Sequence, residues 1–154
     1  MKTAIIGAGV MGRVHLKSLV QLADVEIVAM VDPHVEGAEA ALVEVGLSDA
    51  RAYAEIGDML RETVPEYVIV ASPVRFHAQQ TIAAFEAGAH VMCEKPLCMS
   101  VAEAEAMRDA AQKADRLFTM GLQLRQSHVN QALRQFIAGG GIGDVYHTRV
   151  WGGH

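Results

Sequence analysis

The sequence predicts an α/β fold built on a doubly wound parallel sheet. Short apolar runs alternate along the chain with stretches of helical periodicity, which is the order that builds a parallel sheet from βαβ units. The first apolar run passes directly into a G-x-G-x-x-G turn, and the second ends in Asp32. Hydrophobic residues make up 51% of the chain but aromatic residues only 5%, as expected where small aliphatic side chains pack helices closely on a buried sheet.

The glycine turn follows an expected strand at 2–6 and precedes an expected helix at 13–22. Gly7 permits the tight turn, Gly9 lets the backbone approach a pyrophosphate, and Gly12 lets the helix pack closely on the strand. The N–H groups and positive dipole end of the helix would then hold the phosphates. The backbone positions expected to contact the cofactor here are Gly7, Gly9, Val10, Met11 and Gly12. A glycine-rich turn without a ligand is the alternative.

The second expected strand, at 25–31, ends in Asp32, twenty positions after Gly12. A dinucleotide fold places there the carboxylate that hydrogen-bonds the ribose diol, although such a residue could merely cap the next helix. Positions 33–36 contain no Arg or Lys that could receive a 2′-phosphate, so NAD is favoured over NADP. Arg13, directly after the last glycine, keeps NADP possible.

The remaining elements follow in alternation. Helices are expected at 35–45, in a segment ending near 63, at 76–87 and from 101 onward, and strands at 51–54, 67–71, 90–93 and 117–120. Ser100 and Glu103 form a capping box for the last of these helices. Its expected apolar face consists of Val101, Ala104, Met107 and Ala111.

Composition argues against several functional classes. A net charge of −5 and a pI near 5.8 disfavour nucleic acid or an anionic membrane as the main partner. No apolar run reaches the roughly 18 residues of a membrane-spanning helix. Cys93 and Cys98 have no partners at zinc-ligand spacing, so no metal site is expected. Both cysteines are expected to be reduced structural thiols, as in a cytoplasmic protein.

Two further strand ends carry reactive side chains. Ser72-Pro73 and Glu94-Lys95-Pro96 should lie at the carboxyl edge of the sheet, beside the glycine turn, where open α/β sheets bind ligands. Lys95 is the one cation expected there, and it could polarise a substrate oxygen or be an ordinary surface lysine. His77 could reach the cofactor or simply pack in the first turn of its helix, and His15 is expected to pack.

The segment GAHVMCEKPLCMS (88–100) resembles the signature of the glucose–fructose oxidoreductase and inositol dehydrogenase family. The opening GAGVMGRVHLKSL, with His15, and the stretch ASPVRFH, ending at His77, are also similar to that family. The resemblance implies a Rossmann domain that binds NAD or NADP. It further implies that Ser72, Pro73, His77, Glu94 and Lys95 line the cofactor, that Lys95 acts in catalysis beside the substrate, and that the bond into Pro96 is cis.

The sequence also departs from the family pattern. Val74 stands where Asn is common, and in GLQLRQSH (121–128) Gln126 and His128 replace an aromatic residue and Pro, whereas Arg125 fits and is assigned to substrate. Family members continue into a second α/β domain that often supplies an Asp-x-x-x-His acid–base pair. The resemblance therefore divides the chain into a dinucleotide-binding domain at 1–120 and the start of a truncated second domain at 121–154.

The resemblance implies an oxidoreductase that moves hydride between the nicotinamide and a hydroxyl or carbonyl of a sugar, polyol or similar small molecule. The intact protein is expected to be a homo-oligomer formed through its second domain. An NAD-dependent glycosidase and a non-enzymatic nucleotide-binding regulator are the alternatives. In the tail, Ser127 is expected to cap a helix that ends at 139–141, and residues 145–151 alternate like a strand.

Overall fold

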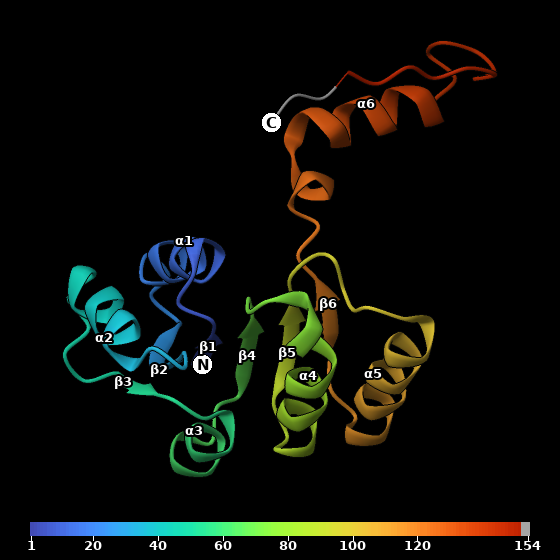
Figure 1. Ribbon diagram of the computed structural model, residues 1–154. Coiled ribbons are helices and arrows are strands. Elements are labelled where there is room, and N and C mark those ends of the chain that lie inside the picture. Colours follow the sequence, from blue (N-terminus) through green and yellow to red (C-terminus); the bar gives the residue numbers. More distant parts are fainter. Residues whose placement is uncertain (152–154) are drawn as a thin grey trace. The chain divides into compact units, whose positions relative to one another are not determined.

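The computed structural model describes residues 1–151. Six parallel strands form one sheet in the order β3-β2-β1-β4-β5-β6 (Figure 1). The strands are β1 (Lys2–Ile6), β2 (Glu26–Val31), β3 (Arg51–Tyr53), β4 (Tyr67–Val70), β5 (His90–Cys93) and β6 (Phe118–Met120). The strand order reverses between β1 and β4, which is the switch point where such sheets bind ligands. The expected doubly wound parallel sheet is confirmed.

Helices cover both faces of this sheet (Figure 1). They are α1 (Val10–Leu19), α2 (Val35–Glu44), α3 (Ile56–Thr63), α4 (His77–Glu86), which follows the 3-10 turn η1 (Val74–Phe76), and α5 (Val101–Ala114). Because successive strand residues point to opposite faces, Ile5 packs with Leu16 of α1 and Leu42 of α2. Its neighbour Ile6 belongs to the opposite cluster, together with Phe85 of α4 and Met107 of α5. The core is therefore two thin layers, one on each side of the sheet.

Several expected boundaries and faces need correction. Helix α1 begins at Val10 and ends at Leu19, not at 13 and 22, because the helical hydrogen bonds start at Gly9, whose carbonyl accepts from Arg13 N at 3.0 Å. In α5, Met107 and Ala111 are buried as expected, but Val101 is 76% exposed. Val101 fits the helical period but faces solvent, so periodicity alone placed it wrongly.

The capping box of α5 is present in a modified form. Ser100 Oγ accepts from Glu103 N at 3.2 Å, as expected of an N-cap serine. The Glu103 carboxylate accepts from Met99 N at 2.7 Å, one residue before the N-cap. Two backbone donors at this helix start are thus satisfied by side chains.

A second compact unit begins at Leu122. It contains the 3-10 helix η2 (Gln123–Gln126) and α6 (His128–Ala138). Ser127 is the N-cap of α6 but makes no side-chain capping bond, so that expected cap is wrong. The strand expected at 145–151 is assigned to the sheet of a second domain, and it does not form in this chain: among the described residues, 143–151 pair with no other strand, and an extended segment becomes a strand only through a ladder of hydrogen bonds.

The tail exposes large apolar side chains that predict association. Tyr146, Val150 and Trp151 are 99%, 82% and 87% exposed, and Phe136 on α6 is 56% exposed. Exposed apolar patches and unpaired extended segments favour pairing between copies. We expect the chain to form dimers or larger species in light scattering as its concentration rises, whereas a version ending at Gly121 stays monomeric. Monomers of both lengths at all concentrations would contradict this expectation.

Candidate cofactor-binding site

The glycine turn joins β1 to α1 and is shaped by close backbone contacts. Gly7 has a φ of +102° and donates its N–H to Val31 O at 2.7 Å. A Cβ added at Gly7 would lie 2.7 Å from Ala71 O, and one added at Gly12 only 1.8 Å from Gly7 O. A Cβ at Gly9 would meet nothing within 4 Å. Packing therefore requires the first and third glycines, whereas the second keeps the space above the turn open.

The start of α1 presents backbone donors to that open space. The first helical hydrogen bond is made by Arg13 N, so the N–H groups of Val10, Met11 and Gly12 precede it and lie at the positive end of the helix. The first turn contains no acidic side chain. An anion at this position meets backbone donors and no acidic side chain from the first turn of α1, so the turn fits the pyrophosphate of a dinucleotide.

Asp32 lies directly after β2 and connects the glycine turn to α2. Its Oδ2 accepts from Ala8 N at 2.9 Å, and its Oδ1 accepts from His34 N at 3.0 Å. Its side chain remains 22% exposed. The carboxylate thus contacts the backbone just before α2 without capping its first turn, so the capping alternative is not met, and it sits beside the phosphate cradle, where the ribose of a dinucleotide lies.

A hollow of about 500 Å³ opens between these elements. Its lining includes Gly7 and Asp32 on one side and Ser72 and Pro73, which follow β4, on the other. Arg75 also lines it, with its guanidinium 4.6 Å from the centre of the Phe76 ring. The expectation that Lys95 is the one cation at this edge is therefore wrong: Arg75, in the turn after β4, lines the hollow, whereas Lys95 is not among its lining residues.

Glu94 and Lys95, which follow β5, have opposite environments. Glu94 is 4% exposed, and its carboxylate lies 2.7 Å from His15 Nε2 and accepts from Lys95 N at 3.1 Å. A Cβ at Gly121 would lie 2.8 Å from the same carboxylate, so a larger residue after β6 would displace Glu94 from its contact with His15. The Lys95 side chain is exposed, and the Lys95–Pro96 bond is cis, as the family resemblance implied.

His15 is the polar site residue that sequence reasoning missed. It does not simply pack in α1, because its ring holds the buried Glu94 carboxylate and so ties α1 to the loop that carries Lys95. Its partner lies 79 positions away, so no local pattern could reveal the pair. Only the family resemblance, which has His at this position, pointed to it.

His77 occupies the interior rather than the rim of the site. It is 1% exposed, with Nε2 2.7 Å from Ser72 O and Nδ1 3.0 Å from Pro96 O. The ring bridges the loops that follow β4 and β5. We therefore revise its expected role from direct cofactor contact to holding both loops in place.

Cys93 and Arg125 do not line the hollow beside the glycine turn. Burial raises the pKa of the Cys93 thiol to about 12, so this thiol is protonated at neutral pH and is a poor nucleophile. Arg125 lines a separate hollow within the second unit.

Within residues 1–151, no group of three or more His, Cys, Asp or Glu side chains is placed to hold a metal ion. No helix in that range is both long and apolar enough to cross a membrane.

Comparison with known proteins agrees with this geometry. A family model described as "Oxidoreductase family, NAD-binding Rossmann fold" matches residues 1–122. The chain belongs to this family. The matched range contains the glycine turn, Asp32 and the Glu94-Lys95-Pro96 element, so these features lie in the part of the chain that carries the NAD-binding fold.

Sugar and polyol dehydrogenases are among the proteins similar to this chain. The chain is 36% identical over 149 residues to the D-glucoside 3-dehydrogenase of Escherichia coli K12, covering 96% of this chain and 42% of that protein. Identity to the inositol 2-dehydrogenase of Leifsonia xyli is 31%, covering 97% and 44%. A scyllo-inositol dehydrogenase from Lactobacillus casei, solved with NAD(H) and scyllo-inositol, superposes with a TM-score of 0.86 at 25% identity, covering 94% and 42%. The chain therefore spans less than half of each relative's length.

Proposed function

We propose that this chain is the cofactor-binding part of an NAD-dependent oxidoreductase that acts on a hydroxyl or carbonyl group of a sugar, polyol or similar small molecule. The observation that carries the proposal is the open phosphate cradle above Gly9 with the Asp32 carboxylate hydrogen-bonded to its edge. A carboxylate there accepts from a ribose diol and repels a 2′-phosphate, which favours NAD over NADP.

Each site residue has a distinct task in this proposal. The backbone of Gly7, Gly9, Val10, Met11 and Gly12 holds the pyrophosphate, and Ser72 and Pro73 form the opposite wall. Bound NAD supplies a hydride acceptor at its nicotinamide ring. Lys95 donates from its exposed ammonium group to the substrate oxygen and stabilises the charge that develops there. Glu94 does not contact substrate; with His15 it holds the backbone of Lys95 in place.

The acid–base group and part of the substrate site are assigned to a second domain in this proposal. The relatives are more than twice as long, and we propose that residues 121–154 lead into a second domain that contributes the acid–base group, further substrate contacts beside Arg125, and the surface of a homo-oligomer. The names of the relatives favour a glucoside or an inositol as the substrate class. The unpaired thiols Cys93 and Cys98 fit a cytoplasmic protein.

Substrate turnover is expected only from a protein that contains both this chain and the proposed second domain. Residues 1–154 alone should produce no NADH from a panel of glucosides and inositols. A longer protein that includes the proposed second domain should produce NADH from at least one of them. In the longer protein, Lys95→Ala should lower kcat by about 100-fold, the usual cost of one lost electrostatic contact to a reacting oxygen. NADH production by the short chain would show that the acid–base group has been misplaced. Substrate cleavage by the longer protein without net NADH would indicate a glycosidase.

A further inference from the structure

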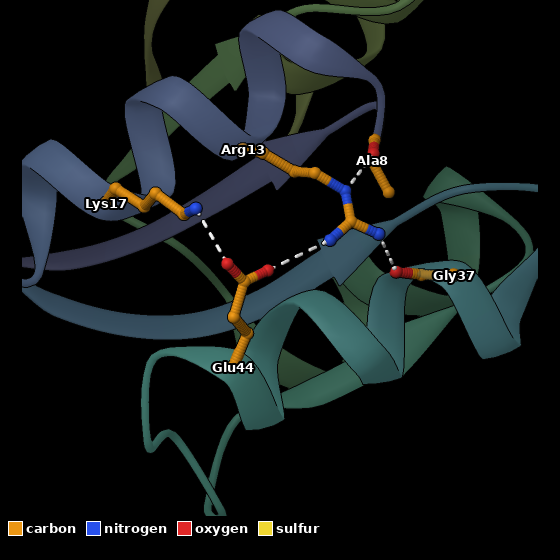
Figure 2. A network of polar contacts seen from close by, with 5 residues as sticks. All are labelled: Ala8, Arg13, Lys17, Gly37 and Glu44. Carbon is orange, nitrogen blue, oxygen red and sulfur yellow. Dashed lines mark hydrogen bonds and ion pairs between the residues drawn. The ribbon is translucent and has the colours of Figure 1, made fainter.

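Arg13 connects the glycine turn to α2 through all three of its guanidinium nitrogens (Figure 2). Nε donates to Ala8 O at 3.0 Å, and Nη2 donates to Gly37 O at 2.8 Å. Nη1 lies 3.4 Å from Glu44 Oε2. The planar guanidinium is thus shared between one carbonyl of the turn, one carbonyl in the first turn of α2 and one carboxylate near the end of α2.

The contact to Ala8 has a direct consequence for the cradle. Ala8 N donates to Asp32 and Ala8 O accepts from Arg13, so the peptide groups on both sides of Ala8 are held. A trans peptide is planar, and its N–H points opposite to its C=O. Fixing the Ala8 carbonyl on the Arg13 side therefore aims the N–H of Gly9 away from Arg13.

Glu44 contacts Arg13 and Lys17 at the same time. Its Oε1 lies 2.7 Å from Lys17 Nζ while Oε2 faces Arg13 (Figure 2). The hydrogen bond and charge of Lys17, aided by Arg13, keep the pKa of Glu44 below its usual value, so the carboxylate is ionised at neutral pH. One carboxylate therefore balances two cations that lie one helical turn apart on α1.

We propose that Arg13 is a positioning residue that orients the glycine turn for the pyrophosphate, and that Glu44, by engaging Arg13 and Lys17, withholds both cations from the 2′-phosphate of NADP. This inference rests on the proposed function, because it requires that the turn bind a dinucleotide. It also resolves the ambiguity that Arg13 posed in the sequence. A cation beside the last glycine does not indicate NADP when protein acceptors already engage each of its three nitrogens.

The test compares four variants of this chain by calorimetric titration with NADH and NADPH. Arg13→Ala and Arg13→Lys should each weaken NADH binding at least tenfold, since an ammonium group cannot replace a three-way guanidinium contact. Glu44→Ala should leave NADH binding within about threefold, because exposed ion pairs contribute little, but should tighten NADPH binding. Lys17→Ala is the matched control: it removes a cation from the same carboxylate without touching the turn, and should leave NADH binding unchanged.

Two additional measurements separate positioning from general destabilisation. Thermal melts should place Arg13→Lys within a few degrees of the wild type, and methylguanidinium should restore NADH binding to Arg13→Ala. An Arg13→Lys variant that binds NADH as well as the wild type would overturn the positioning role, even if Arg13→Ala fails to fold. Unchanged NADPH binding in Glu44→Ala would overturn the selectivity role. If the wild-type chain itself binds no NADH, the proposed function fails instead.

Discussion

Gly12→Ala is expected to destabilise the fold more than any other single methyl addition in the glycine turn. The new Cβ would lie 1.8 Å from Gly7 O and 2.9 Å from Gly7 C, which are backbone atoms of the turn itself. Relief requires α1 to move off β1, and such overpacking costs about 3 kcal/mol. Urea denaturation of the variant and the wild type measures this loss as a lower midpoint.

Gly9→Ala is the matched comparison. Its Cβ meets nothing within 4 Å, so the variant should unfold at the wild-type urea concentration. The added methyl would project into the space that the pyrophosphate requires, and NADH binding should weaken at least tenfold, or about 1.4 kcal/mol. The account is contradicted if the two variants lose stability equally, or if Gly9→Ala binds NADH as the wild type does.

Asp32→Ala is expected to have the largest effect on cofactor choice. Removing the carboxylate removes the acceptor for a ribose diol, so NADH binding should weaken by about 10- to 100-fold. NADPH binding should change little, because losing the repulsion on the 2′-phosphate offsets losing the bonds that hold Ala8 and His34. The variant also leaves Ala8 N and His34 N without their acceptor, which should lower the free energy of unfolding by about 1–3 kcal/mol.

Asp32→Asn separates the two contributions of the carboxylate. An amide retains one acceptor oxygen but carries no charge, so this variant should recover part of the stability and bind NADPH better than the wild type. Calorimetric titration of both variants with both cofactors gives the comparison. Equal losses of affinity for NADH and NADPH in Asp32→Ala would show that Asp32 only stabilises the glycine turn through its hydrogen bond to Ala8 N.

The sequence predicted the sheet because its signals are local. The strand at His90–Cys93 has the bounds that the sequence indicated, since its apolar run is bracketed by Gly88 and by the charged Glu94. The glycine turn could be interpreted in the same way, because Gly7 and Gly12 serve contacts within the turn or with the adjacent strand, while Gly9 leaves space open beside them. Periodicity was less reliable at helix ends, where Val101 and Leu22 match the pattern but lie beyond the edge of the core.

The parts that escaped prediction depend on contacts between distant segments. His15 meets Glu94 across 79 positions, and Arg13 meets Gly37 and Glu44 across 24 and 31. No local pattern encodes such pairs, because they arise only when helices are packed on the sheet. The strand expected at 145–151 does not form in this chain for a related reason: β-branched and aromatic residues favour a strand only where a neighbouring strand can pair with it.

Calorimetric titration of the wild-type chain with NADH and then NADPH tests the central claim most directly. The cradle above Gly9 and the carboxylate of Asp32 predict one NADH bound per chain, with NADPH weaker by at least tenfold. A well-folded chain that binds neither cofactor, or that binds NADPH more tightly than NADH, would contradict the account.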